Sequence, residues 1–127
     1  MKALEAGIIS ANATRLAEFY VKALGFEIVK RLDYPEGLVY RLANGAALCK
    51  IFQPVSDAPI ELKRQNWREY SGFSYAALHV EDADAVVESA RAHGAAVISE
   101  PRSHRPGARF AMIADPDGNI FEILEES

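Results

Sequence analysis

The chain has a single cysteine, a single tryptophan and no long apolar run among its 127 residues. The lone Cys49 excludes an internal disulfide and is typical of a reducing compartment. No apolar stretch approaches the roughly 20 residues that cross a membrane, and the first ten residues lack the apolar segment of a secretory signal. The 14 basic and 18 acidic residues are interspersed, without the basic stripe that nucleic acid requires. We therefore expect a cytoplasmic protein with neither a nucleic-acid partner nor a membrane partner.

Two amphipathic helices are predicted within this half-apolar sequence. The first follows Asn12, a preferred N-cap residue, and ends at Gly25; the second follows Asp82 and ends at Gly94. One strand-like segment precedes each helix and three follow it. These segments are residues 4–10, 26–32, 37–43 and 46–52 in the first half, and 73–80, 95–99, 108–114 and 119–124 in the second. The order β-α-β-β-β therefore occurs twice, which indicates an internal repeat of about half the chain.

The repeat predicts an α+β fold. Three consecutive strands joined by short turns favour mixed, largely antiparallel sheets with helices on one face, rather than a doubly wound parallel sheet. We expect one domain made of a first module over residues 1–55 and a second over 73–127. Residues 56–72 contain Pro59, many polar residues and the tryptophan, so they are interpreted as a linker that could also cover a site.

Three stretches resemble the vicinal oxygen chelate superfamily, which includes glyoxalase I, extradiol dioxygenases, methylmalonyl-CoA epimerase and bleomycin-resistance proteins. They are "LAEFYVKALGFEIVKR", "HVEDADAVVESARAHGAAVISEP" and "DPDGNIFEILE". The resemblance covers nearly the whole chain. It implies the glyoxalase-like fold, in which two βαβββ modules form curved mixed sheets around a shared cavity. It also implies a homodimer, sometimes formed by exchange of modules.

The resemblance further implies four inward-facing positions that hold a metal in many members. In this sequence they are Glu5 and Tyr75 on the first strands, and Lys50 and Glu122 on the last. Only Glu122 matches the family pattern. Glu5 could bind a cation, whereas Tyr75 is a poor ligand for divalent ions at neutral pH. Lys50 offers only donors and repels a cation.

We therefore expect no metal, with zinc, nickel, iron or manganese held by Glu5 and Glu122 as the alternative. The ammonium of Lys50 could occupy the place of the ion and pair with both acids. Three interpretations stay open: a structural ion-pair network, a metal-free binding or catalytic centre, and an intact metal site. In a catalytic centre, Glu5 or Glu122 would be the general base, and Tyr75 or Lys50 the acid or oxyanion partner.

Other side chains are candidates for ligand binding, each with a structural alternative. Phe52 shares a strand face with Lys50, and Trp67 lies in the linker; both could line an apolar pocket or simply pack. His79 could lie at the pocket rim or be a hydrogen-bonded histidine at a strand end. Arg41 could hold a carboxylate or phosphate, or be an exposed strand arginine.

The segment "PRSHRPGARF", residues 101–110, is rich in basic residues. It is predicted to be a solvated loop or, alternatively, a loop at the mouth of the cavity in which Arg109 contacts an anion.

Three functions follow from these residues and from the resemblance. The first is a small-molecule binding protein that needs no metal, similar to resistance proteins that sequester a drug. The second is an enzyme of the glyoxalase or dioxygenase kind that transfers a proton next to a carbonyl. The third is a module used mainly for association.

Overall fold

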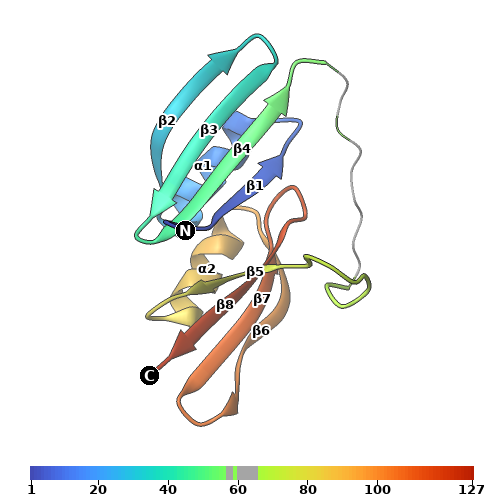
Figure 1. Ribbon diagram of the computed structural model, residues 1–127. Helices are drawn as coiled ribbons and strands as arrows, with labels where there is room; N and C mark the ends of the chain where they lie inside the picture. Colours follow the sequence, from blue (N-terminus) through green and yellow to red (C-terminus); the bar gives the residue numbers. More distant parts are fainter. Residues whose placement is uncertain (57–58, 60–65) are drawn as a thin grey trace. The chain divides into compact units, whose positions relative to one another are not determined.

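The computed structural model describes residues 1–56, 59 and 66–127. The chain divides into two compact units, Met1–Glu61 and Leu62–Ser127, whose boundary falls inside the predicted linker. Each unit contains one β-α-β-β-β module (Figure 1). The predicted α+β architecture of two similar modules is confirmed.

The first unit is a four-stranded sheet covered on one face by a helix. Its elements are β1 (Glu5–Ile9), α1 (Ala13–Leu24), β2 (Glu27–Tyr34), β3 (Gly37–Asn44) and β4 (Ala47–Pro54). The strand order is β1-β4-β3-β2, with β1 parallel to β4 and the other pairs antiparallel. Helix α1 lies behind this sheet in Figure 1, so the opposite face is turned to the viewer.

Helix α1 begins and ends as its sequence predicts. The Asn12 side chain accepts a backbone hydrogen bond at the N-terminus, and Gly25 adopts the left-handed conformation (φ 73°) that ends the helix. Its apolar stripe, which includes Leu16 and Tyr20, is fully buried against sheet residues such as Ile51. This packing turns alternate residues of each strand toward the helix and leaves the others on the opposite face.

The second unit repeats the same topology. Its elements are β5 (Ala76–His79), α2 (Ala83–Ala92), β6 (Ala96–Arg105), β7 (Ala108–Ala114) and β8 (Ile120–Glu126). The strand order is β5-β8-β7-β6, with β5 parallel to β8. Asp82 caps α2 by accepting from the Ala85 amide. In both units the last strand therefore lies in the middle of the sheet, between the first strand and the third.

One predicted boundary is wrong. The strand predicted over residues 108–114 is β7, but the residues before it, expected as a loop, continue β6 to Arg105, so only two residues make the turn. Gly107 has φ 76° and follows Pro106, the pattern of a type II turn. β6 lies at the edge of the sheet and still pairs with β7 at Ser99, Arg102 and Arg105, with register shifts between these positions. Polar composition was therefore a poor guide to a loop here.

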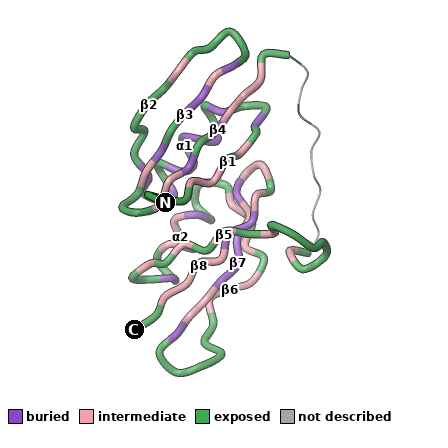
Figure 2. Tube along the Cα trace, in the orientation of Figure 1, coloured by how far each residue is buried: buried purple, intermediate pink, exposed green. Residues whose placement is uncertain are grey.

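Burial follows the topology. Figure 2 shows buried segments on the helices and on the central strands β3, β4, β7 and β8, whereas β2 is exposed along most of its length. Within the described residues, neither helix has the length and hydropathy needed to cross a bilayer.

Candidate functional site

The open face of each sheet, meaning the face opposite its helix, carries most of the predicted site residues. In β4, Cys49 and Ile51 are buried toward α1, while Lys50 and Phe52 alternate with them and point to the open face. The prediction that Phe52 shares a strand face with Lys50 is therefore confirmed.

Strand register brings three basic residues together on the open face of the first unit. Lys50 of β4 lies opposite Arg41 of β3, and Arg41 lies opposite Lys30 of β2. Directly opposed residues of an antiparallel pair project from the same face, with Cβ atoms roughly 5 Å apart. We call Lys30, Arg41 and Lys50 the cation row. On the far side of Lys50, β1 contributes Gly7, which leaves that side open.

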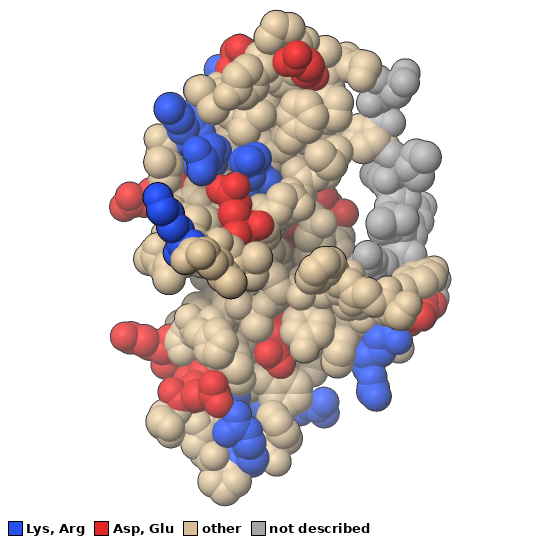
Figure 3. Space-filling view, in the orientation of Figure 1, with Lys and Arg blue, Asp and Glu red and all other residues tan. Residues whose placement is uncertain are grey.

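Glu5 is the acidic partner of this row. Its Oε1 lies 3.4 Å from Lys50 Nζ, and its Oε2 lies 3.5 Å from Arg41 Nη2. The side chain of Glu5 is 25% exposed, whereas Lys50 and Arg41 are nearly half exposed. The predicted ion pair between Lys50 and Glu5 is present, and Arg41 joins it. Figure 3 shows basic and acidic side chains in contact on this face of the first unit.

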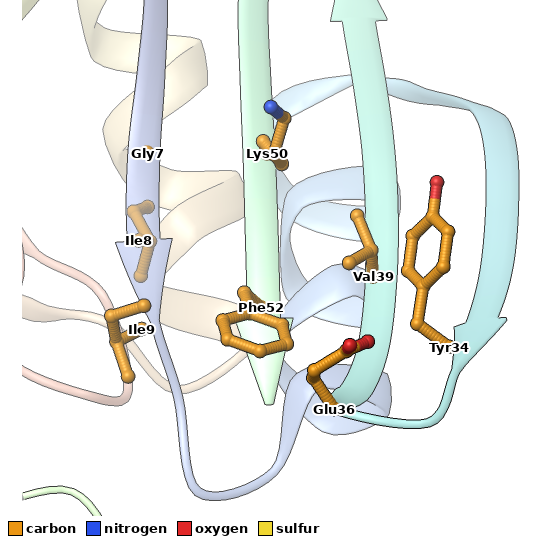
Figure 4. A pocket seen from close by; sticks show the side chains of 8 residues that line it. All are labelled: Gly7, Ile8, Ile9, Tyr34, Glu36, Val39, Lys50 and Phe52. Atoms are coloured by element: carbon orange, nitrogen blue, oxygen red, sulfur yellow. The ribbon is translucent and has the colours of Figure 1, made fainter. Parts of the chain in front are cut away.

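A groove of about 490 Å³ continues from the cation row along the open face of the first unit. Figure 4 shows Lys50 at one end, Glu36 at the other, and Phe52 and Val39 between them. The residues that line the groove are Gly7, Ile8, Ile9, Tyr34, Glu36, Val39, Lys50 and Phe52. Its wall is therefore apolar except at the two ends.

Sequence reasoning found Lys50 and Phe52 but missed most of this lining. Val39 lies opposite Phe52 on β3, and Ile9 lies opposite Phe52 on β1. These pairings follow from strand order and register, which a single sequence does not reveal. Glu36 lies in the β2–β3 turn, where its carbonyl accepts from the Val55 amide at 2.9 Å. That hydrogen bond ties the turn to the end of β4.

The remaining predicted residues lie in the second unit. Glu122 of β8 lies opposite Ala77 and Met112 and points to the open face of the second sheet. It is half-buried, and no residue that the structure describes forms a hydrogen bond or ion pair with it. Its place on the open face agrees with the orientation expected from the sequence. Lys50 belongs to the first unit, so the expected pair between Lys50 and Glu122 stays a prediction.

Two aromatic residues of the second unit pack against each other. The rings of Trp67 and Tyr75 meet edge to face, with centroids 5.3 Å apart, and Tyr75 remains 44% exposed. This contact uses the face of one ring and leaves the Tyr75 side chain partly open to solvent. A ligand contact by either residue stays a prediction.

His79 and Arg109 have partners in the structure. His79 Nδ1 lies 3.8 Å from Glu126 Oε1, a contact between two charges when the histidine is protonated and longer than a hydrogen bond. Arg109 donates from Nε and Nη2 to both carboxylate oxygens of Asp84, each at 2.9 Å, and to the Pro101 carbonyl. These hydrogen bonds to the Asp84 carboxylate raise the pKa of the Arg109 guanidinium. The predicted anion contact of Arg109 would have to break this bidentate pair.

The donor set of the first unit does not fit a divalent metal. The groups around the Glu5 carboxylate are an ammonium and a guanidinium, which donate hydrogen bonds and have no lone pair to offer. Within the described ranges, no three His, Cys, Asp or Glu side chains gather as a metal site would require.

Two βαβββ modules, each with an open sheet face opposite its helix, define a glyoxalase-like α+β protein. The sequence profile of the Glyoxalase/Bleomycin resistance protein/Dioxygenase superfamily matches residues 3–123. The chain belongs to this superfamily.

Individual relatives agree with this assignment. A probable lactoylglutathione lyase from Synechocystis sp. is 31% identical over 116 residues, which cover 87% of this chain and 84% of the relative. Lactoylglutathione lyase GLX1 from Arabidopsis thaliana is 29% identical over 117 residues, but the matched region spans only 39% of that longer protein.

Solved structures show the same fold. A glyoxalase family protein from Bacillus cereus has a TM-score of 0.84 at 16% identity, over 99% of this chain and 95% of that chain. Glyoxalase I from Zea mays has a TM-score of 0.80 at 19% identity, over 98% of this chain and 47% of that chain. At these identities the likeness extends to the fold alone.

Proposed function

We propose that this protein binds a small organic molecule in the groove on the open face of the first unit, without a metal ion. The observation that carries this proposal is the groove itself. It has an apolar wall and a volume of about 490 Å³, within the usual range for small-molecule sites.

The groove offers apolar surface that a ligand would remove from water. Ile9 is 55% exposed on its wall, and Phe52 is half-buried at its centre. Burial of such surface contributes about 25 cal/mol per Å², and an aromatic ring adds stacking with a flat ligand. The Glu5–Lys50–Arg41 cluster at one end supplies the polar groups that orient a ligand.

A second candidate function is proton transfer by Glu122, in a reaction of the kind that lactoylglutathione lyase relatives suggest. The observation that favours it is the half-buried Glu122 carboxylate, which has no hydrogen-bonding or ionic partner among the described residues. Glu5 is a weaker candidate for the base, since two cations already contact its carboxylate oxygens. A general base needs a free acceptor oxygen within reach of the substrate proton.

The binding proposal is tested by comparing Ile9→Ala with Val29→Ala. Both residues are exposed aliphatic side chains on strands of the same sheet, at 55% and 66% exposure, but only Ile9 lines the groove. Ligands found in a thermal-shift screen of small aromatic and aliphatic molecules should bind Ile9→Ala more weakly and Val29→Ala normally. Equal binding by both variants would show that the ligands bind elsewhere.

Gly7→Val provides a complementary test, since it fills the groove. A Cβ at Gly7 has no atom within 4 Å, and valine suits a strand, so the variant should fold and lose ligand binding. Binder and enzyme are then separated by incubating each ligand with the protein and analysing the mixture. Unaltered ligand supports the binder, while a product that disappears in Glu122→Gln supports the enzyme.

A further inference from the structure

We propose that the ligand of the groove is an amphipathic organic monoanion, whose anionic group contacts the cation row and whose apolar body lies along Phe52. This inference rests on the proposed function and specifies its ligand class. Three features carry it: the excess of positive charge at one end of the groove, the apolar wall beyond it, and a carboxylate at the other end.

The positive charge of the cation row exceeds the negative charge that contacts it. Lys30, Arg41 and Lys50 lie side by side across three strands, and the contacting acid is Glu5. Lys30 makes no ion pair or hydrogen bond with any residue that the structure describes. Like charges directly opposite each other on a sheet are unfavourable. Such a local conflict is typical of a functional site, and a bound anion would relieve it.

The row has the chemistry of an anion site. The guanidinium of Arg41 presents planar donors that match carboxylate, sulfonate or phosphate oxygens, and the ammonium groups on either side add point charges. Arg41 and Lys50 remain nearly half exposed although both contact Glu5. An incoming anion would share these donors with Glu5, so Glu5 should weaken binding of the anion.

The remainder of the groove restricts what the anion is attached to. From Lys50 to the end of β4 at Pro54, which pairs with Gly37 beside Glu36, the strand covers roughly 13 Å. The wall over this length is formed by apolar side chains such as Phe52 and Val39. At the far end, the Glu36 carboxylate would repel a second negative charge. The geometry therefore favours a monoanion with an apolar body over a dianion of the same length.

The anion contact is tested with two fluorescent probes that share one apolar body. 8-Anilinonaphthalene-1-sulfonate carries a sulfonate, and N-phenyl-1-naphthylamine is the same ring system without it. Fluorescence titration of the folded protein should give tighter binding of the sulfonate. The difference should shrink as salt is raised, since salt screens exposed charges.

Charge-removing variants locate the contact. When a unit charge of the protein lies about 6 Å from a bound anion in water, its removal changes the Kd of the anion about threefold. Lys30→Gln and Arg41→Gln should each raise the Kd of the sulfonate about threefold, and Glu5→Gln should lower it by a similar factor. The Kd of the neutral probe should not change. Lys22→Gln is the matched control, because Lys22 is an exposed lysine of the same unit that lies on α1.

The role of Glu36 is tested by competition between decanoate and decanedioate for the sulfonate probe. The wild-type protein should prefer decanoate, and Glu36→Gln should reduce that preference about threefold. An unchanged preference in Glu36→Gln would refute the role of Glu36 in excluding dianions.

The outcomes separate this inference from the proposed function. If both probes bind and Ile9→Ala weakens them, but the cation-row and Glu5 variants leave the sulfonate unaffected, the groove is a binding site and the anion inference is wrong. If neither probe responds to Ile9→Ala or Gly7→Val, the proposed function itself is wrong.

Discussion

Removing Glu5 should destabilise the first unit more than removing Lys50, although the two side chains form one ion pair. Glu5→Gln breaks two contacts, to Lys50 and to Arg41, and leaves the cation row without its acid. Lys50→Gln breaks one contact and leaves Glu5 paired with Arg41. It also removes a repulsion, because Lys50 lies opposite Arg41 on the neighbouring strand.

The expected magnitudes follow from the distances and the exposure. At 3.4 and 3.5 Å, each contact contributes about 1.2 kcal/mol at the dielectric constant of water. Screening by salt and the entropy that the two side chains lose in forming the contact reduce this value by about half. With the uncompensated repulsion added, Glu5→Gln should lower the free energy of unfolding by about 1–1.5 kcal/mol. Lys50→Gln should lower it by about 0–0.5 kcal/mol, because the lost attraction and the lost repulsion nearly cancel.

Urea denaturation of both variants measures their free energies of unfolding and shows which variant is less stable. In about 1 M NaCl the Debye length falls to about 3 Å, so the difference between the variants should shrink. A Lys50→Gln variant that is as unstable as Glu5→Gln, or more so, would refute the account of a row held together by one shared acid.

Three further predictions concern other parts of the chain. Gly37→Ala should destabilise by about 1–3 kcal/mol, because a Cβ there would overlap the Phe52 ring and the neighbouring strand, whereas Gly7→Ala has free space and should not lower the melting temperature. The hydrogen bond from Arg105, with its charge and that of His79, holds the pKa of the Glu126 carboxyl below its ordinary value. Its stabilisation is therefore present above the ordinary carboxyl pKa and is lost as the pH falls through the lowered one, so the urea midpoints of wild type and Glu126→Gln should converge as the pH falls below the ordinary carboxyl pKa. Elemental analysis of the purified protein should show less than one equivalent of zinc, nickel, iron or manganese, and a full equivalent lost together with stability on chelation would contradict the metal-free proposal.

The fold was predictable because local signals and the repeat agreed. Asn12 and Gly25 mark the ends of α1, and Asp82 and Gly94 bracket α2, because caps and left-handed glycines act over a few residues. The boundary that was wrong is the end of β6, expected at Ser99 and found at Arg105. It depends on pairing with β7, which local composition does not encode.

The candidate site was predictable only in part, for a related reason. Alternation along one strand correctly placed Lys50 and Phe52 on one face. The neighbours that give these residues a role, Lys30, Arg41 and Ile9, come from other strands. Their positions depend on strand order and register, which are tertiary properties. The second contact of Glu5, with Arg41, was missed for the same reason.

The central position of the last strand in each sheet affects how the chain is made and how it tolerates shortening. β4 pairs with β1 on one side and β3 on the other, and β8 does the same with β5 and β7. During synthesis, the first and third strands of each unit therefore each keep an unpaired edge until the last strand has been made. Unpaired strand edges make this state prone to aggregation. A nonsense mutation just before residue 120 would remove β8, which lies in the middle of the second sheet and not at its edge. The truncated protein should therefore be degraded.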